Sequence, residues 1–319
     1  MKQYNELNKV LEGKTGFLLI THEEPDGDAI GATLSLYSFL SDSGKKVLAV
    51  SRDSVPPFFS FLDENKLLNS DFLVGDYEVI ILIDNGDLKR TGFADRIKKA
   101  KRSGKTIINI DHHPQNDIWK LADINIAFPS YSSTSEIMYE ILTVNGYEID
   151  STVATALLAG IYYDTGGFQH SNTSKKVMDI VSDLLKRGAR LKKISKNIAK
   201  ARSVNMLKLW GIALNRITIV KEFGLAYSVL TQDDIRYTGA SEEEISGLVN
   251  LINSAAEAEA SLLIYESDNG NIKGSLRTES DKVDVSALAK LFGGGGHKKA
   301  SGFSFSGRIT KVGENWRLD

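Results

Sequence analysis

The strongest constraint on the fold is an alternation of short apolar runs with helical patterns through the first half of the chain. Two helical patterns lie between these runs, at 29–44 and 94–104, and each ends in glycine, as helices commonly do. Strands joined through helices pair in parallel and are buried on both faces, so this rhythm predicts an α/β domain around a parallel sheet. The runs with the length and composition of strands are 16–20, 46–50, 79–84 and 106–111.

The chain of 319 residues is long enough for a second domain of ordinary size. From about 133 to 187 the pattern is mainly helical, and Ser133-x-x-Glu136 predicts a helix start. Towards the C-terminus, strands and helices alternate in a smaller α+β pattern, in which 241–258 is predicted to form one amphipathic helix. The predicted segments are a parallel-sheet domain at 1–187, a helical linker at 188–212 and a smaller α+β domain at 213–319. A solvated charged face accounts for the cations of the linker equally well.

Composition excludes several classes of protein. The 39 Lys and Arg nearly balance the 41 Asp and Glu, which leaves no electrostatic case for gripping long duplex nucleic acid. The chain has no cysteine, which excludes zinc–thiolate sites, iron–sulfur clusters, cysteine nucleophiles and disulfides. Its polar start does not resemble a signal peptide, and its apolar runs are too short to span a bilayer. We therefore expect a cytoplasmic protein with no membrane partner.

Histidines and aspartates mark the candidate site. Four of the five histidines stand in short acidic or glycine-rich motifs, namely HEEPDGD, IDHH and GGGGH. The first two motifs directly follow predicted strands, and ligands bind open α/β sheets at the carboxyl ends of their strands. The side chains expected to meet at this edge are His22, Asp26, Asp28, Asp84, His112, His113 and, after a helical run, Asp164.

Imidazole and carboxylate donors without thiolate suit a first-row divalent ion such as Mn²⁺. Two ions about 3.5–4 Å apart lower the pKa of a shared water towards 7, which provides a nucleophile for phosphoryl transfer. Each residue alone has a simpler explanation: Asp26-Gly27 as a turn, His22 as a satisfied polar residue and Asp84 as a strand-end cap. Their joint occurrence at strand ends favours a site that holds two metal ions.

The motifs resemble, in order, those of the DHH phosphoesterases with a DHH-associated C-terminal domain. The resemblance covers nearly the whole chain. It is most similar to the stand-alone oligoribonuclease (nanoRNase)/pAp phosphatase and dinucleotide phosphodiesterase branch. The motifs that carry it are His22-x-x-Pro25-Asp26-Gly27-Asp28, Ile83-Asp84-x-x-Asp87, Asp111-His112-His113, Asp164-Thr165-Gly166 and Gly293-Gly294-Gly295-Gly296-His297.

The resemblance implies roles for these residues. His22 and Asp26 would bind one metal ion, Asp28, His112 and Asp164 the second, and Asp84 would bridge both. His113 would face the scissile phosphate, and Asp111 would orient a histidine. In the second domain, the residues implied in substrate binding are Arg277, Gly294, Gly295, Gly296 and His297. The plain alternative for the glycine run is a helix end followed by a turn. The active site would lie in the cleft between the two domains.

We expect a two-metal phosphodiesterase, with Mn²⁺ as the ion, that hydrolyses short single-stranded oligoribonucleotides and dinucleotides to mononucleotides. pApA is one such substrate, and cyclic di-AMP is a further candidate. The alternatives are a 3′-phosphatase acting on pAp, an inorganic pyrophosphatase and a nucleotide sensor without turnover. The sequence leaves open the physiological substrate, the preferred metal, interdomain motion, a homodimer, and the roles of Glu23, Glu24, Asp87 and His170.

Overall fold

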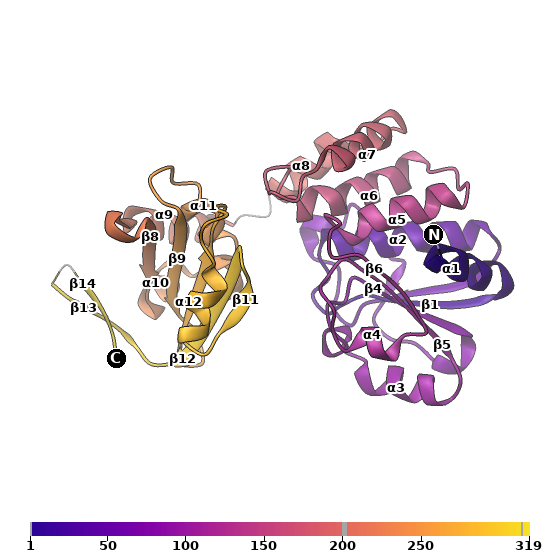
Figure 1. The fold of residues 1–319 in the computed structure, drawn as a ribbon, viewed down its shortest axis with the longest axis horizontal. Helices are drawn as coiled ribbons and strands as arrows, with labels where there is room; N and C mark the ends of the chain where they lie inside the picture. The colour runs from indigo at the N-terminus through magenta and orange to yellow at the C-terminus, as the bar shows by residue number, and fades with distance from the viewer. Residues whose placement is uncertain (1, 200–202, 314) are drawn as a thin grey trace. The chain divides into compact units, whose positions relative to one another are not determined.

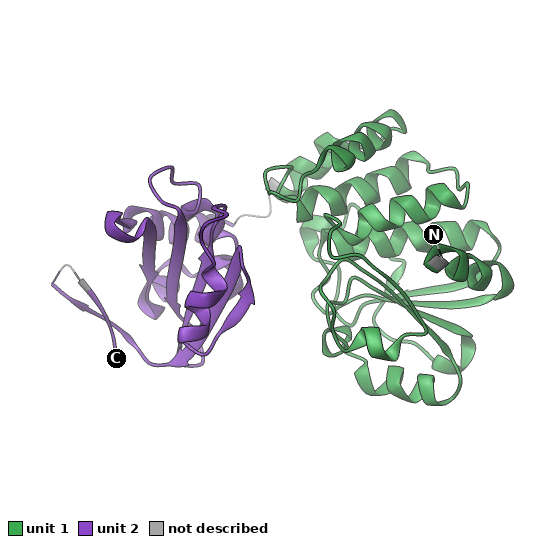
Figure 2. Cartoon of the chain, in the orientation of Figure 1, with its two compact units in different colours: residues 1–201 green, residues 202–319 purple. Residues whose placement is uncertain are grey.

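The computed structural model describes residues 2–199, 203–313 and 315–319. The chain divides into two compact units, residues 1–201 and 202–319 (Figure 2). The division falls within the predicted linker 188–212, of which residues 200–202 lie outside the described residues. On either side of it the linker is helical, with helix Leu191–Ala199 in the first unit and helix Val204–Asn215 in the second.

The first unit is built around a parallel sheet of six strands in the order β3-β2-β1-β4-β5-β6 (Figure 1). This confirms the predicted α/β class with a parallel sheet. Its strands are β1 Gly16–Ile20, β2 Lys46–Val50, β3 Leu68–Asn69, β4 Val79–Ile83, β5 Thr106–Asp111 and β6 Ile124–Ala127. Its helices are α1 Lys2–Gly13, α2 Gly27–Asp42, α3 Ala94–Arg102, α4 Ile118–Leu121, α5 Thr134–Val144, α6 Ser151–Asp164, α7 Lys175–Lys186 and α8 Leu191–Ala199. Short 3₁₀ turns are η1 Pro57–Phe59, η2 Val74–Asp76 and η3 Lys89–Thr91.

Helices cover both faces of this sheet, which is why its central strands are continuously apolar. Strand β1 sends Phe17 and Leu19 into the core shared with α2, α5, α6 and α7, and Leu18 and Ile20 into the core shared with α3 and α4. Figure 1 shows the same division, with α2, α5 and α6 on one side of the sheet and α3 and α4 on the other. Because successive residues of a strand face opposite ways, burial on both faces removes the usual alternation of polar residues.

The second unit contains a mixed sheet of six strands in the order β11-β12-β10-β9-β8-β7, and a separate hairpin, β13–β14. Only β8 and β9 pair in parallel; the other neighbours are antiparallel. Its strands are β7 Thr218–Val220, β8 Leu225–Leu230, β9 Ala260–Glu266, β10 Asn271–Arg277, β11 Gly295–His297, β12 Ala300–Ser306, β13 Ile309–Val312 and β14 Asn315–Leu318. Its helices are α9 Val204–Asn215, α10 Gln232–Thr238, α11 Leu248–Ile252 and α12 Val285–Leu291, with 3₁₀ turns η4 Lys221–Phe223 and η5 Glu242–Ile245.

The single helix predicted over 241–258 is wrong. The segment forms the 3₁₀ turn η5 and the short helix α11, and Gly247 lies between them with φ of 84°. A residue in this left-handed conformation interrupts a right-handed helix, and glycine adopts it without steric cost. Among the described residues, no helix has both the length and the apolar character needed to cross a bilayer.

Candidate metal centre

The candidate ligands follow three strands that are neighbours in the parallel sheet. His22 lies two residues beyond β1, Asp84 directly follows β4, and His112 directly follows β5. Strands β1, β4 and β5 are adjacent and parallel, so their carboxyl ends lie side by side. The remaining ligands come from helices: Asp26 is the N-cap of α2, Asp28 lies in its first turn, and Asp164 is the last residue of α6.

The side chains form two groups that meet at Asp84. In the first group, His22 Nε2 lies 3.9 Å from an oxygen of Asp26 and 3.9 Å from one of Asp84. The second group comprises Asp28, His112 and Asp164, with potential donor atoms within 4.8 Å of one another. His112 Nε2 lies 3.1 Å from Asp164 and 3.7 Å from Asp84, so Asp84 lies next to both groups. The residues of these two groups are those that the resemblance assigns to the two ligand sets, and Asp84, His112 and His113 form a third group of donor atoms within the same distance.

The aspartates of the cluster are buried or half-buried and have no Lys or Arg to neutralise them in the described part of the chain. Asp28 and Asp84 are 0% and 2% exposed. Across residues 2–199, 203–313 and 315–319, no Lys or Arg forms an ion pair with Asp26, Asp28, Asp84 or Asp164. Burial and the charge of Asp164 raise the pKa of Asp28 to about 7. Burial and then the charges of Asp28 and Asp26 raise the pKa of Asp84 well above its ordinary value.

Such a cluster is costly unless a cation compensates it. Two divalent ions fit this donor set, because the carboxylates supply negative charge and the histidines supply neutral nitrogen donors. Burial alone would lower the pKa of His112, but its hydrogen bond to Asp164 and the charge of that residue raise it to about 9. Without a metal ion, His112 therefore takes up part of the compensating positive charge.

Hydrogen bonds orient the histidines. His22 Nδ1 lies 2.6 Å from the carbonyl oxygen of Glu23, which can only accept, so Nδ1 carries the proton and Nε2 presents a lone pair to Asp26 and Asp84. His113 Nδ1 lies 2.7 Å from the buried carboxylate of Asp111, which turns Nε2 away from that residue. Burial would raise the pKa of Asp111, but the hydrogen bond and charge of His113 hold it below its ordinary value. Asp111 thus orients His113.

The backbone places Asp84 by an unusual conformation. Asp84 has φ of 58°, in the left-handed region that aspartate and asparagine tolerate better than most residues. Its amide donates to the carbonyl of Ile110 on β5 at 3.0 Å, which holds the chain against the neighbouring strand end. The side chain thereby comes to lie between the two groups of ligands.

The first turn of α5 contributes to the site in a way that the sequence analysis missed. The backbone N–H groups of Thr134 and Ser135 donate to the two oxygens of Asp28 at 2.6 and 2.8 Å. The hydroxyl of Thr134 donates to Asp84 at 2.8 Å. The available signal was Ser133-x-x-Glu136, since α5 begins as predicted and Ser133 Oγ accepts from the N–H of Glu136. A free helix N-terminus attracts a carboxylate, but the sequence does not say which one.

The structure also places the residues whose roles were left open. Asp87 accepts from the N–H of Arg90 at 2.9 Å and so stabilises the turn η3. His170 is exposed and lies against Gly166, where a Cβ would come within 2.2 Å of its ring. Glu23 accepts from Arg52 Nη1 at 3.0 Å, and the N–H of Glu24 donates to Asp53. None of these four side chains belongs to the two ligand groups.

In the second unit, Arg277 lies at the end of β10 beside a pocket of about 280 Å³. Its guanidinium donates to the carbonyl of Leu276 and, within the described part of the chain, forms no ion pair with a carboxylate. Burial lowers the pKa of this guanidinium. The pocket is lined by Glu242, Glu243, Ile245, Ser246, Gly247, Val249, Leu263, Tyr265, Ser275 and Arg277. A half-buried arginine without a counterion is suited to a bound anion.

Only the second half of the glycine run belongs to β11. The N–H groups of Gly293 and Gly294 donate to the carbonyls of Lys290 and Ala289 and close the end of α12, which is the helix end of the plain alternative. Residues Gly295, Gly296 and His297 pair with β12, and His297 and Arg277 both lie opposite Ala300. Residues directly opposite one another in a sheet share a face, so Arg277 and His297 project to the same side. A Cβ on Gly294 would lie 2.1 Å from the carbonyl oxygen of Gly302, and one on Gly296 would lie 2.7 Å from that of Ala300. Two of the glycines are therefore required by the approach of β12, whereas Gly295 has open space.

Comparison with known proteins identifies both parts of the chain. A family model described as the DHH family, N-terminal domain, matches residues 17–161, and one described as the DHHA1 domain matches residues 223–314. The match to residues 17–161 contains the motifs from His22 to His113, and the match to residues 223–314 contains Gly293 to His297, whereas Asp164-Thr165-Gly166 lies outside both.

Relatives extend over most of the chain. The bifunctional oligoribonuclease and PAP phosphatase NrnA of Thermus thermophilus is 27% identical over 308 residues, which are 96% of this chain and 89% of the relative. The protein of the same name from Bacillus subtilis is 26% identical over 304 residues, 94% of this chain and 92% of the relative. A solved structure of an exopolyphosphatase-related protein from Bacteroides fragilis superposes with a TM-score of 0.86 and 29% identity, covering 96% of this chain and 92% of that one.

Proposed function

Because the chain belongs to the DHH family, we propose that it is a metal-dependent phosphodiesterase that hydrolyses short oligoribonucleotides and dinucleotides to mononucleotides. The observation that carries the proposal is the cluster of aspartates and histidines around the carboxyl ends of β1, β4 and β5, in which Asp28 and Asp84 are buried without an ion pair to Lys or Arg among the described residues. The relatives from Thermus thermophilus and Bacillus subtilis, described as oligoribonucleases, support the substrate class.

In this proposal, two divalent ions occupy the two ligand groups. His22 and Asp26 would hold one ion, and Asp28, His112 and Asp164 would hold the other; the carboxylate of Asp84 lies next to both groups. Mn²⁺ is the proposed ion, because imidazole and carboxylate donors without thiolate suit it. When bound, the ions supply Lewis acidity to the phosphoryl oxygens and lower the pKa of a water molecule.

The residues of the chain then position and stabilise the reacting groups. Asp111 holds the ring of His113 through Nδ1 and directs Nε2 away from itself; as an imidazolium, His113 would donate a hydrogen bond from Nε2 to an oxygen of the scissile phosphate. Thr134 fixes the carboxylate of Asp84 through its hydroxyl, and the first turn of α5 fixes that of Asp28. In the second unit, Arg277, Gly294, Gly295, Gly296 and His297 are the proposed contacts for a second phosphate or the nucleotide. An arginine fork and exposed backbone N–H groups both suit phosphate.

A 3′-phosphatase activity on pAp is the second candidate. It is favoured by the names of the relatives, which describe one protein with both activities. A phosphate monoester and a diester present similar oxygens to the same cluster, so the residues described above serve either substrate. We also propose that the protein acts in the cytoplasm, on nucleotides or short single strands and not on long duplexes. The same proposal includes a homodimer.

The test is product analysis with Mn²⁺, with and without a chelator. The substrates are pApA, cyclic di-AMP, a pentanucleotide RNA, a much longer RNA and pAp. We expect release of mononucleotides from the short substrates, loss of that release with chelator, and little cleavage of the long RNA. Cleavage of the long RNA at the same rate would contradict the preference for short substrates. No turnover of any substrate by the Mn²⁺-loaded protein would reject the proposed function and leave the sensor and pyrophosphatase alternatives.

A further inference from the structure

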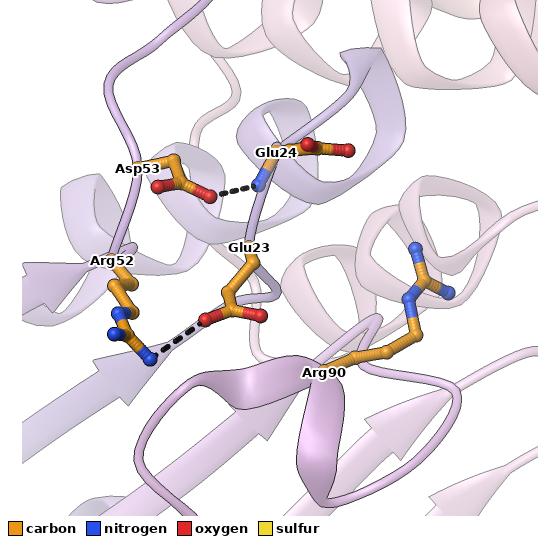
Figure 3. A pocket seen from close by; sticks show the side chains of 5 residues that line it. All are labelled: Glu23, Glu24, Arg52, Asp53 and Arg90. Atoms are coloured by element: carbon orange, nitrogen blue, oxygen red, sulfur yellow. Dashed lines mark hydrogen bonds and ion pairs between the residues drawn. The ribbon is translucent and has the colours of Figure 1, made fainter. Parts of the chain in front are cut away.

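A second pocket opens directly beside the metal cluster. It has a volume of about 470 Å³, and Glu23, the residue after His22, is part of its lining. Its lining is entirely charged and consists of Glu23, Glu24, Arg52, Asp53 and Arg90 (Figure 3). These residues come from the loops after β1, β2 and β4, and so from the same edge of the sheet as the metal cluster.

Two of the three carboxylates in this pocket already have partners. Glu23 accepts from Arg52 Nη1 at 3.0 Å, and Asp53 accepts from the N–H of Glu24 at 2.9 Å (Figure 3). Arg90 differs, because its guanidinium has no carboxylate within ion-pair distance among the residues that the structure describes. The pocket thus contains one arginine that is neutralised and one that is not.

The backbone of Arg90 is held firmly although its side chain is exposed. Its N–H donates to Asp87 at 2.9 Å, and its carbonyl accepts from the N–H of Glu23 at 2.7 Å. These bonds tie the turn η3 to the loop that carries His22. The main chain therefore fixes where the side chain of Arg90 begins relative to the cluster, while the N–H groups of its guanidinium remain available to a ligand.

The guanidinium lies at the edge of the metal cluster. Its Nη2 is 3.5 Å from His22 Nδ1. This contact is not a hydrogen bond, because Nδ1 already donates its N–H to the backbone carbonyl of Glu23. Its Nη1 lies 3.1 Å from the position that a Cβ on Gly86 would take, and Cδ2 of His113 lies 3.5 Å from the same point. The absence of a side chain at Gly86, whose φ is 66°, leaves open the space between Arg90 and His113.

An unpaired cation next to a cluster that holds divalent cations is repelled by them unless an anion lies between. A phosphate group fits this requirement. The guanidinium of arginine matches the spacing of the phosphate oxygens, and the negative charge of the phosphate compensates both the guanidinium and the metal ions. Resting on the function proposed above, we infer that Arg90 is a substrate-binding residue that holds, together with His113, the oxygens of the substrate phosphate at the metal cluster.

The test compares Arg90→Ala with Lys89→Ala. Lys89 is the adjacent residue of η3, exposed and outside the pocket, so its removal changes the net charge equally without removing the guanidinium. With pApA and Mn²⁺, we expect Arg90→Ala to lower kcat/KM by about 100-fold, the range for loss of a donor to a developing phosphoryl charge. Lys89→Ala should remain within about two-fold of the wild type, because exposed charges are screened.

A binding measurement gives a readout that does not depend on turnover. Titration of AMP and of inorganic phosphate into the Mn²⁺-loaded proteins should show at least about ten-fold weaker binding for Arg90→Ala, whereas Mn²⁺ affinity itself stays unchanged. Arg90→Lys should recover part of the binding, because it restores the charge without the fork. Arg90→Ala that binds AMP as tightly as Lys89→Ala overturns the inference.

Two other outcomes separate this inference from the proposed function. If Arg90→Ala weakens Mn²⁺ binding as much as AMP binding, the residue acts by positioning His22, and the inference is wrong. If the wild type cleaves no substrate of the panel but binds AMP through Arg90, the proposed function fails while the anion site stands. If the Mn²⁺-loaded wild type binds neither AMP nor phosphate, the anion site itself is rejected.

Discussion

The candidate metal cluster of the first unit and the ion pairs of the second unit neutralise acidic side chains in opposite ways. In the first unit, Asp28 and Asp84 are buried beside other carboxylates and, in the described part of the chain, have no Lys or Arg as ion-pair partners. In the second unit, Asp234 accepts two hydrogen bonds from Arg216, and Glu242 is paired with Lys273. The difference separates acidic groups that complete the fold from acidic groups that await a cation from solution.

The largest expected effect is that of Asp84→Asn, because this residue adjoins both ligand groups. We expect activity on pApA to fall by about 1,000-fold or more, since the substitution removes a charge that positions the reacting groups. Asparagine retains the left-handed conformation that the position requires, so the fold should persist. The measurement is the initial rate with Mn²⁺, together with thermal unfolding with and without the ion.

The thermal measurement sharpens the comparison. Because the neutral amide removes a carboxylate that is buried among others, metal-free Asp84→Asn should be at least as stable as the metal-free wild type. Addition of Mn²⁺ should raise the Tm of the wild type far more than that of the variant. If Mn²⁺ raises the Tm of the variant as much as that of the wild type, the assignment of Asp84 to both metal-ligand groups is wrong.

Arg277→Ala tests a half-buried cation that, among residues 203–313 and 315–319, has no carboxylate as an ion-pair partner. We expect kcat/KM on pApA to fall by about 100-fold through loss of a phosphate contact, with the Tm increase caused by Mn²⁺ unchanged. The matched control is Arg308→Ala, an exposed arginine of the same unit, which should leave kcat/KM unchanged. Wild-type kinetics of Arg277→Ala would remove this residue from substrate binding.

Glycine-to-alanine substitutions in helices of the two units should have opposite signs. A Cβ on Gly160 in α6 would lie 2.1 Å from Ser135 Oγ and 2.6 Å from Asp28, so Gly160→Ala should lower the free energy of unfolding by about 1–3 kcal/mol. Gly211 in α9 is exposed with nothing within 4 Å, so Gly211→Ala should raise it by about 0.5–1 kcal/mol. Urea unfolding of both variants provides the measurement, and equal effects would show that the packing around Asp28 is not tight.

The last expected effect, which depends on pH, concerns the paired carboxylate of Asp234. Burial would raise the pKa of Asp234, but the hydrogen bond and charge of Arg216 lower it. A lowered pKa in the folded state means that the pair stabilises the fold above the unfolded pKa of about 4 and that this contribution disappears as pH falls below it. Asp234→Asn should therefore cost about 1–2 kcal/mol at neutral pH and less in acid.

The control for Asp234→Asn is its response to Mn²⁺. Asp234→Asn should leave the Tm increase caused by Mn²⁺ intact, in contrast to Asp84→Asn. A destabilisation of Asp234→Asn that does not change between neutral and acidic pH would show that the ion pair does not account for the stability of this region.

Much of the fold followed from local patterns. The strands at 16–20, 46–50 and 106–111 were predicted at the bounds that the structure shows, because their apolar runs are continuous and end at glycines or polar turns. The helix predicted over 241–258 failed because a single glycine, Gly247, takes a left-handed conformation that hydrophobic periodicity does not register. The candidate metal ligands could be picked out for the same local reason, since each stands beside a strand or helix end.

The sequence by itself determined the parallel-sheet class, the position of each metal-binding motif at the end of an element and the absence of thiolate chemistry. These are properties of residue type and spacing along the chain, which need no knowledge of the partner segments. Only the tertiary structure decided that β1, β4 and β5 are neighbours, that α5 supports Asp28, and that Arg52 pairs with Glu23 and leaves Arg90 free. Those outcomes depend on distances between segments far apart in sequence, and packing of the whole unit sets such distances.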